Sequence, residues 1–233
     1  MRGDSHVHAG LCESLACSIV PFLLTSAFGG PEIRRYVREY CDDTTGKMVG
    51  CFAFTEPDHG SDWVLAGQSE MDDPKFSPSV RAVRKGSEYV ITGQKSDFIS
   101  NGPIATHALL ILNVDRSKGM RGTGIAFIPL DLPGISRSKP LDKLGLRSYP
   151  QGAIVFDEVK IPENMMIVSE PEQGFGTQQW ILTPAGELLS SVNTGLYGLR
   201  IFLGHVRIPL AVNHEEFEHW RLDLRNFLGR RLV

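Results

Sequence analysis

The sequence is poor in cysteine, carries no basic stripe and shows no regular metal-ligand spacing. Its four cysteines, Cys12, Cys17, Cys41 and Cys51, have no CxxC spacing and no interleaved histidine. We therefore expect no metal site and no disulfide framework, and four free thiols favour a reducing compartment. The net charge is −3 with the two signs mixed along the chain. The electrostatic footprint of a nucleic-acid-binding protein is therefore missing.

The chain also lacks an apolar run long enough to cross a lipid bilayer. The main candidate, Leu15–Phe28, contains Pro21 and is shorter than a membrane span requires. A secretory leader needs a basic start, whereas Arg2 is the only positive charge before this run, and Asp4 and Glu13 add negative charge. We expect a protein of the cytoplasm, or of the mitochondrial matrix if its source is eukaryotic.

Helical patterns stand near both ends of the chain. Residues Leu11–Phe28 predict a buried helix or helix pair, and Pro31 suits the first turn of a second helix after a glycine break. That second helix has one apolar face, as an amphipathic helix requires. The face consists of Ile33, Tyr36, Val37 and Tyr40. After Gly174 the apolar periodicity again predicts helices, the last over His214–Leu228.

Between these ends, short apolar runs recur between turn residues. They are Met48–Phe54, Val80–Val83, Tyr89–Thr92, Ala108–Val114, Ile125–Leu130 and Ala153–Val159. No helical pattern long enough for a parallel crossover separates them, and no glycine-rich nucleotide fingerprint follows any of them. The sequence therefore predicts an α+β protein, with an antiparallel β-barrel or sandwich as middle domain and partial helical segments on either side. The expected boundaries are 1–46, 47–170 and 171–233.

One polar loop, Thr55–Asp62, directly follows the first of these runs. It combines the hydroxyls of Thr55 and Ser61 with Pro57 and Gly60. The proline fixes the backbone where the strand ends, and the glycine allows the backbone to turn or to approach a ligand closely. Each hydroxyl can donate and accept a hydrogen bond. A plain hairpin loop would use several of the same residues, so the loop alone leaves both interpretations open.

A second polar stretch, Gly93–Gly102, offers the Phe98 ring beside the Ser100 hydroxyl. A flavin needs from its protein a stacking surface, hydrogen bonds at the ring edge and a cradle for the pyrophosphate. An aromatic ring with a neighbouring hydroxyl meets the first two needs. The alternative interpretation is a hairpin with Phe98 in the core.

Together these stretches resemble the acyl-CoA dehydrogenase family. Phe52–Asp62 is similar to the family's Thr-Glu-Pro…Gly-Ser-Asp signature, Gly93–Gly102 to its Gly-x-Lys…Ile-Thr-Asn segment, and Leu144–Ser148 with Phe156–Pro162 to a third family segment. The resemblance runs from Val20 to about Gly176 and centres on the family's middle β domain. It implies that residues 1–46 are a remnant of an N-terminal helical domain, and that 171–233 are a partial, divergent C-terminal helical segment.

The resemblance implies FAD as cofactor and α,β-desaturation of an acyl-CoA thioester as reaction. It also implies hydride transfer to the flavin, an electron-transfer flavoprotein as acceptor and a homo-oligomer. Thr55 and the strand before it would face the flavin pyrimidine, while Ser61 would lie near the pyrophosphate with its backbone close to the substrate. Phe98 would lie beside the isoalloxazine, and Ser100 would bond its edge. The implied cofactor-binding residues are Phe52, Ala53, Phe54, Thr55, Gly60, Ser61, Phe98, Ile99 and Ser100.

The chain departs from the family pattern at several positions. His59 stands where a small residue is usual, and Lys95–Phe98 is one residue longer than the common form. Two outcomes of this insertion stay open, a β-bulge or a changed direction of Phe98. Glu56 corresponds to a structural loop acid of the family. The catalytic glutamate has no visible counterpart: by the register from Gly174, the position it takes in some members is Ala185. The remaining candidate base, Glu187, lies roughly 200° further around the helix.

Three functional interpretations remain open at this point. The first is an acyl-CoA dehydrogenase-type oxidoreductase. The second is a flavin-dependent monooxygenase of the same fold, which altered site residues would suit. The third is a truncated member without catalysis, which the missing base favours, because loss of a general base alone slows a reaction roughly a hundred- to ten-thousandfold.

Overall fold

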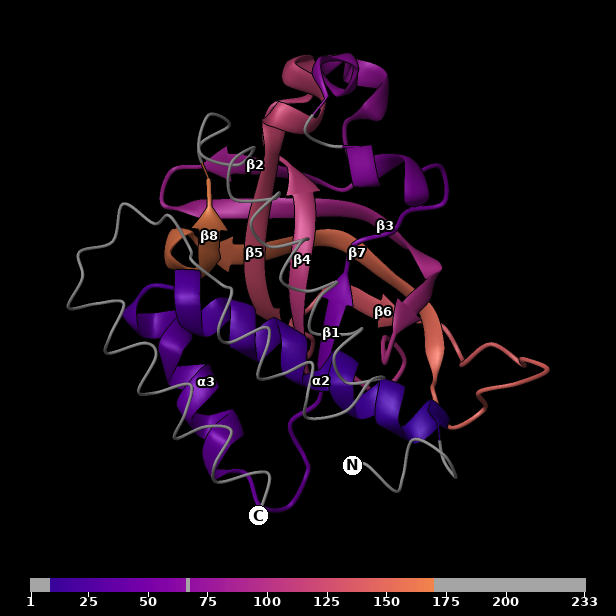
Figure 1. Ribbon diagram of the computed structural model, residues 1–233. Coiled ribbons are helices and arrows are strands. Elements are labelled where there is room, and N and C mark those ends of the chain that lie inside the picture. Colours follow the sequence, from indigo (N-terminus) through magenta and orange to yellow (C-terminus); the bar gives the residue numbers. More distant parts are fainter. Residues whose placement is uncertain (1–8, 66–67, 170–233) are drawn as a thin grey trace.

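The computed structural model describes residues 9–65 and 68–169 of the chain (Figure 1). Two helices, α2 (Ala9–Phe28) and α3 (Pro31–Asp42), come first. The strands are β1 (Gly50–Ala53), β2 (Arg81–Lys85), β3 (Glu88–Ser100), β4 (His107–Asn113), β5 (Thr123–Pro129), β6 (Ile135–Arg137), β7 (Gln151–Pro162) and β8 (Met166–Val168). Short 3-10 helices connect them: η1 (Ser61–Leu65), η2 (Ser69–Asp72), η3 (Pro74–Phe76), η4 (Arg116–Gly122) and η5 (Glu163–Met165). The helices predicted after Gly174 lie outside the described residues.

The N-terminal helices form as the apolar pattern predicts. The first is one continuous helix, although it contains Pro21. The second begins at Pro31, where the missing N–H of proline costs no intrahelical hydrogen bond. Its predicted apolar face is confirmed, because Ile33, Val37 and Tyr40 are buried. Among the described residues, no helix is long and apolar enough to span a membrane.

The strands form one eight-stranded sheet in the order β6-β7-β3-β2-β4-β5-β8, with β1 beside β4 (Figure 1). The β3–β7 pair is antiparallel, as are β2–β3, β4–β5, β5–β8 and β6–β7. The antiparallel sheet that the sequence predicts therefore forms, with two parallel pairings that were not predicted. β1 runs parallel to β4, with Gly50 opposite His107. β2 also meets β4 in a single parallel pairing, Arg81 opposite Asn113.

The parallel pairing was missed because its crossover contains no long helix. Parallel strands need a long connection to return in the same direction. Between β1 and β4 that connection consists of η1, η2, η3 and the β2–β3 hairpin. Short 3-10 turns and a hairpin leave no helical periodicity in the sequence.

The sheet separates two hydrophobic cores. Every residue of β4 is buried, because its side chains alternate between them. Ala108, Leu110 and Leu112 belong to the core that the strands form among themselves. Leu109 and Ile111 pack instead with residues of α2 and α3. The two helices thus cover one side of the sheet in Figure 1. The candidate site lies along the long strands β3 and β7.

The buried His107 makes the fold sensitive to mild acid. Its ring lies among Phe22, Tyr36 and Phe127, stacked on Phe127 at 5.6 Å between centroids. This burial lowers the pKa of His107 to about 4, against the opposing effect of the Asp131 charge.

We therefore expect the free energy of unfolding to fall as the pH drops from about 6.5 to about 4. In that window the unfolded chain binds a proton that the folded chain does not, which costs about 3 kcal/mol of stability at the lower end. Urea unfolding of the wild type and of His107→Gln across this pH range measures the effect. The variant should show a shallower dependence on pH, and equal slopes would contradict the assignment.

Candidate functional site

The three segments singled out in the sequence meet along β3. The loop Thr55–Asp62 contacts β3 near Lys95 and Ser96. The third segment pairs with β3 through Phe156–Pro162 of β7, where Phe156 lies opposite Gly93, and at the other end of β3 Ser100 lies opposite Gln151. Gln151 also donates from Nε2 to the Phe98 carbonyl oxygen at 3.3 Å. Residues far apart in sequence thus meet along the length of β3.

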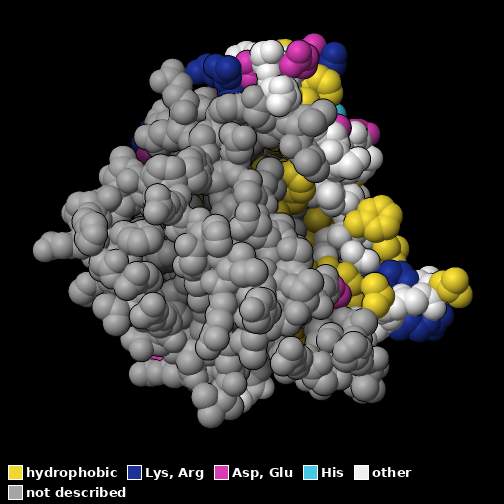
Figure 2. All heavy atoms as spheres, viewed as in Figure 1, with side chains coloured by type: hydrophobic (Ala, Val, Ile, Leu, Met, Phe, Trp, Pro, Cys, Tyr) yellow, Lys and Arg dark blue, Asp and Glu magenta, His cyan; other side chains and the backbone are white. Residues whose placement is uncertain are grey.

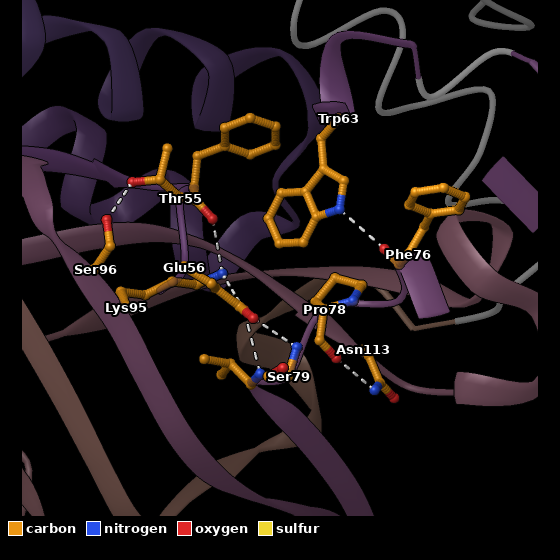
Figure 3. Close-up of polar contacts among 11 residues, drawn as sticks. Thr55, Glu56, Trp63, Phe76, Pro78, Ser79, Lys95, Ser96 and Asn113 are labelled. Atoms are coloured by element: carbon orange, nitrogen blue, oxygen red, sulfur yellow. Dashed lines mark hydrogen bonds and ion pairs between the residues drawn. The ribbon is translucent and has the colours of Figure 1, made fainter. Parts of the chain in front are cut away.

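A buried ion pair holds the first segment to β3 (Figure 3). Lys95 Nζ lies 2.8 Å from Glu56 Oε1, and both side chains are 0% exposed. The Glu56 carboxylate also accepts from the Ser79 N–H at 2.5 Å and from the Val80 N–H at 3.2 Å. Lys95 Nζ donates a further hydrogen bond to the Phe54 carbonyl oxygen at 2.9 Å. With its carboxylate satisfied by three donors, Glu56 is a structural acid, as the sequence predicts.

The ion pair compensates for the cost of burying Lys95. Burial removes the ammonium from water and lowers its pKa, whereas the charge and hydrogen bond of Glu56 act in the opposite direction. A buried charge is tolerated only with such a partner. Lys95 therefore requires Glu56, and the start of the polar loop is fixed against the middle of β3.

The pairing of β3 with β7 is irregular between Lys95 and Ile99, the region in which the sequence places its extra residue. β3 takes four residue steps from Lys95 to Ile99, where β7 takes two from Ile154 to Gly152. Ser96 anchors the bulge to the loop, because its Oγ lies 2.7 Å from Thr55 Oγ1 and its N–H donates to the Thr55 carbonyl oxygen at 3.0 Å.

The bulge turns Phe98 away from the core. Its side chain is 65% exposed, which excludes the interpretation that Phe98 is a core residue of a hairpin. Ile99 next to it is buried in the core with 1% exposure. An exposed aromatic ring on a fixed strand provides the stacking surface that a planar ligand needs.

Gly60 is a glycine that the fold itself does not need. A Cβ at this position would meet only Thr55 Cγ2, at the ordinary contact distance of 3.5 Å. By contrast, a Cβ at Gly50 would come within 2.4 Å of the Ser18 carbonyl oxygen. The close approach that Gly60 allows is therefore directed outward. The neighbouring Ser61 side chain is exposed and, among the described residues, has no hydrogen-bond partner.

His59 fills the inside of the loop. Its Nδ1 lies 2.7 Å from Asp62 Oδ2, and its ring stacks on Trp63 with centroids 5.2 Å apart. Burial disfavours the Asp62 charge, but hydrogen bonds from the Gly60 N–H and His59 outweigh it and lower the pKa of Asp62. Trp63 is in turn fixed by donating from Nε1 to the Phe76 carbonyl oxygen at 2.9 Å (Figure 3). The larger residue is thus accommodated by stacking.

The remaining predicted site residues contribute unequally. Phe52 and Phe54 stack on each other with centroids 5.6 Å apart, and both are partly buried. The Ala53 side chain is buried in the core, as is that of Ile99. Only the backbone of these two residues could meet a ligand. Glu187 lies outside the described residues.

The loop between β6 and β7 projects beside this surface. Hydrophobic and basic side chains stand together on the projection (Figure 2), and Leu144 is fully exposed while Leu146 is half exposed. Tyr149, at the base of the loop, points inward, and its hydroxyl lies 2.5 Å from Ser100 Oγ. Tyr149, the residue that follows Leu144–Ser148, therefore brings this loop to Ser100.

Sequence reasoning missed the roles of Lys95 and Tyr149. A lysine within an apolar strand, with a glutamate at the end of an earlier strand, is a signal for a buried pair. No comparable signal marks Tyr149, because its partners come from three separate segments. Within the described residues, no group of three or more His, Cys, Asp or Glu side chains could hold a metal ion.

Comparisons with known proteins point to one family. Residues 51–159 match the family model described as acyl-CoA dehydrogenase, middle domain. The short-chain specific acyl-CoA dehydrogenase, mitochondrial, of Rattus norvegicus is 28% identical over 176 residues, which cover 76% of this chain and 38% of that protein. The caffeyl-CoA reductase-Etf complex subunit CarC of Acetobacterium woodii is 32% identical over 175 residues, covering 75% and 41%.

Solved structures agree on the fold. The butyryl-CoA dehydrogenase of Megasphaera elsdenii superposes with a TM-score of 0.64 at 21% identity, covering 93% of this chain and 54% of that one. At this sequence identity the structural similarity supports the α+β fold with a β middle domain. The chain spans about 40% of the length of the curated relatives it matches.

We expect Lys95→Met to destabilise the fold strongly. It leaves the Glu56 carboxylate buried without its counter-charge, which costs about 3–5 kcal/mol in comparable cases. Combining it with Glu56→Gln removes both charges and should recover part of the loss. The matched control is Arg84→Met, which breaks the exposed Arg84–Glu163 pair and should cost less than about 1 kcal/mol. Chemical denaturation measures all of these, and similar losses for Lys95→Met and Arg84→Met would contradict the role of the buried pair.

Proposed function

Because the chain belongs to the acyl-CoA dehydrogenase family, we propose that its middle domain, residues 47–170, forms one wall of an FAD site in an oxidoreductase that acts on acyl-CoA thioesters. Residues 1–46 and 171–233 are then parts of the flanking helical regions. The observation that carries the proposal is the exposed Phe98 ring, which the bulge fixes between the Thr55 loop and Ser100.

The geometry supports the proposed contacts of Phe98 and Ser100, and those of Thr55 and Ser61 rest on the family pattern. Phe98 offers its ring to the isoalloxazine, and Ser100 offers a hydroxyl to the edge of that ring system. Thr55, with the backbone of Phe52–Phe54, faces the pyrimidine side. Ser61 holds the pyrophosphate, and its backbone lies near the thioester. When bound, FAD supplies a hydride acceptor for the β-carbon of the substrate.

The residues present fit this cofactor. At Gly60 the described residues leave room for a ligand beside the backbone. Ser61 has an exposed hydroxyl without a hydrogen-bond partner among the described residues. Donors on a tight turn beside an unobstructed backbone are what a pyrophosphate requires. The His59 ring lies against Trp63, which keeps it out of that space.

We further propose an acyl-CoA thioester as substrate and an electron-transfer flavoprotein as electron acceptor. A homo-oligomer is the proposed assembly. The printed names of the relatives support the first two, since they include an acyl-CoA dehydrogenase and a subunit of a caffeyl-CoA reductase-Etf complex. The catalytic base is not identified among the described residues. The remaining candidate from the sequence, Glu187, would need a shifted register to serve.

We expect Gly60→Ala to weaken FAD binding without weakening the fold. The added methyl meets no atom of the described residues closer than 3.5 Å but enters the proposed pyrophosphate space, where a misfit of this size costs about tenfold in affinity. Titration of the purified 233-residue chain with FAD, followed by absorbance, measures the affinity, and urea unfolding measures stability.

The matched control is Gly30→Ala, whose added methyl meets no described atom within 4 Å and which lies at the N-cap of α3, away from the polar loop. It should leave FAD affinity unchanged and cost less than about 1 kcal/mol of stability, because alanine is less favourable than glycine at an N-cap. A wild-type chain that takes up no FAD would overturn the proposed function. Uptake that Gly60→Ala does not affect would place the pyrophosphate elsewhere.

We expect the FAD-loaded chain to keep its flavin spectrum when butyryl-CoA is added without oxygen. No base lies at the wall described above, and general-base catalysis is worth roughly a hundred- to ten-thousandfold in rate. Stopped-flow absorbance of the wild type and of Glu187→Gln tests this. Rapid bleaching that disappears in Glu187→Gln would instead identify Glu187 as the base.

A further inference from the structure

A polar strip on α2 faces the proposed flavin wall. Ser14, Cys17 and Ser18 share one side of the helix, because residues three and four apart lie above one another. Ser14 Oγ donates to Asn101 Oδ1 at 2.7 Å, and Asn101 Nδ2 donates back to the Ser14 carbonyl oxygen at 2.7 Å. Ser18 Oγ accepts from the Gly50 N–H at 3.1 Å. The strip thus fixes the helix to β1 and to the end of β3.

Tyr149 links this strip to Ser100. Its hydroxyl lies 3.0 Å from Cys17 Sγ and 2.5 Å from Ser100 Oγ. The backbone around Tyr149 is held as well: Lys143 Nζ donates to its carbonyl oxygen at 2.6 Å, and its N–H donates to the Leu146 carbonyl oxygen at 2.9 Å. Three groups from α2, β3 and the loop before β7 therefore form a continuous hydrogen-bond chain.

All three groups carry a hydrogen at neutral pH. Burial raises the pKa of Tyr149, although its hydrogen bond to Ser100 acts in the opposite direction. Burial likewise raises the pKa of the Cys17 thiol against its hydrogen bond to Tyr149. Neither group is therefore an anion that would compel its neighbour to donate. Each of the two hydrogen bonds can run in either direction.

The number of hydrogens decides what Ser100 can offer to a ligand. Each hydroxyl has one hydrogen to donate and two lone pairs to accept with. If Cys17 donates to Tyr149 and Tyr149 to Ser100, the hydrogen of Ser100 is left for an outside acceptor. If the chain runs the other way, a lone pair of Ser100 is left for an outside donor. Rotation of the hydroxyls alone converts one arrangement into the other.

We propose that Tyr149 and Cys17 are positioning residues, which hold the Ser100 hydroxyl at the edge of the flavin ring and let it either donate or accept there. The proposal rests on the proposed function, because it takes the flavin edge to lie at Ser100. It adds two residues to the site, and one of them comes from α2. The helix thereby serves the cofactor through the chain Cys17–Tyr149–Ser100.

Tyr149 could instead serve only to attach α2 to the sheet. The two roles differ in how Tyr149 and Ser100 combine. A positioning residue acts through Ser100, so its effect on the ligand disappears when the Ser100 hydroxyl is gone. A purely structural contact has the same effect with and without that hydroxyl, since the two changes are then independent.

The test is a double-variant cycle on FAD affinity. Tyr149→Phe keeps the ring and removes only the hydroxyl, and it should weaken FAD binding about fivefold, the equivalent of one ordinary hydrogen bond. In the Ser100→Ala background the same change should have no effect. The absorption bands of the bound flavin should shift in Tyr149→Phe, since the hydrogen bonding at the ring edge changes.

Two further variants keep the test decisive if Tyr149→Phe perturbs folding. Cys17→Ser retains a hydrogen-bonding group and should preserve FAD affinity, whereas Cys17→Ala should weaken it about twofold, a fraction of one hydrogen bond. Tyr89→Phe, which removes a buried phenol at the other end of β3, should change nothing.

The outcomes separate the two proposals. A wild-type chain that binds no FAD overturns the proposed function and this inference together. Normal binding by the wild type and an unchanged affinity in Tyr149→Phe overturn only the inference. An equal loss from Tyr149→Phe in the wild-type and Ser100→Ala backgrounds also overturns it, because Tyr149 would then act by attaching the helix.

Discussion

The buried pair between Glu56 and Lys95 is the constraint on which the candidate site depends. An ammonium and a carboxylate without access to water must satisfy each other, because the effective cost of burying either ion alone is several kcal/mol. Here Lys95 comes from the middle of β3 and Glu56 from the loop after β1, so the charge requirement fixes two separate backbone segments. The same carboxylate also accepts the N–H groups that lead into β2.

From that fixed point the rest of the site follows along β3. The residues after Lys95 bulge outward, Ser96 holds the bulge to Thr55, and Phe98 is left exposed. Beyond the bulge the strand pairs again with β7, where Ser100 meets Tyr149. One strand thus presents an aromatic ring and a hydroxyl at a set separation. Such a preorganised surface lowers the cost of binding a rigid planar cofactor, because little of the protein has to be ordered on binding.

The departures from the family pattern are absorbed locally. The longer stretch before Phe98 becomes the bulge, and the larger His59 stacks on Trp63 with Asp62 holding its Nδ1. Neither change obstructs the exposed wall. A site for the cofactor and a group for proton abstraction are therefore separate questions in this chain. The described residues of the middle domain bear on the first question and leave the second open to experiment.

The sequence by itself determined that two helices precede the sheet, and it also located most strands and the polar segments, since turn residues, apolar alternation and motif residues are local features of the chain. It also indicated the bulge, because an inserted residue in a paired strand must leave the ladder. Only the tertiary structure decided that β1 runs parallel to β4, that Phe98 faces outward and that Tyr149 joins Ser100 to α2. These features depend on which distant segments meet. The buried pair of Glu56 and Lys95 determines that the loop meets β3, and no local sequence pattern predicts such a contact.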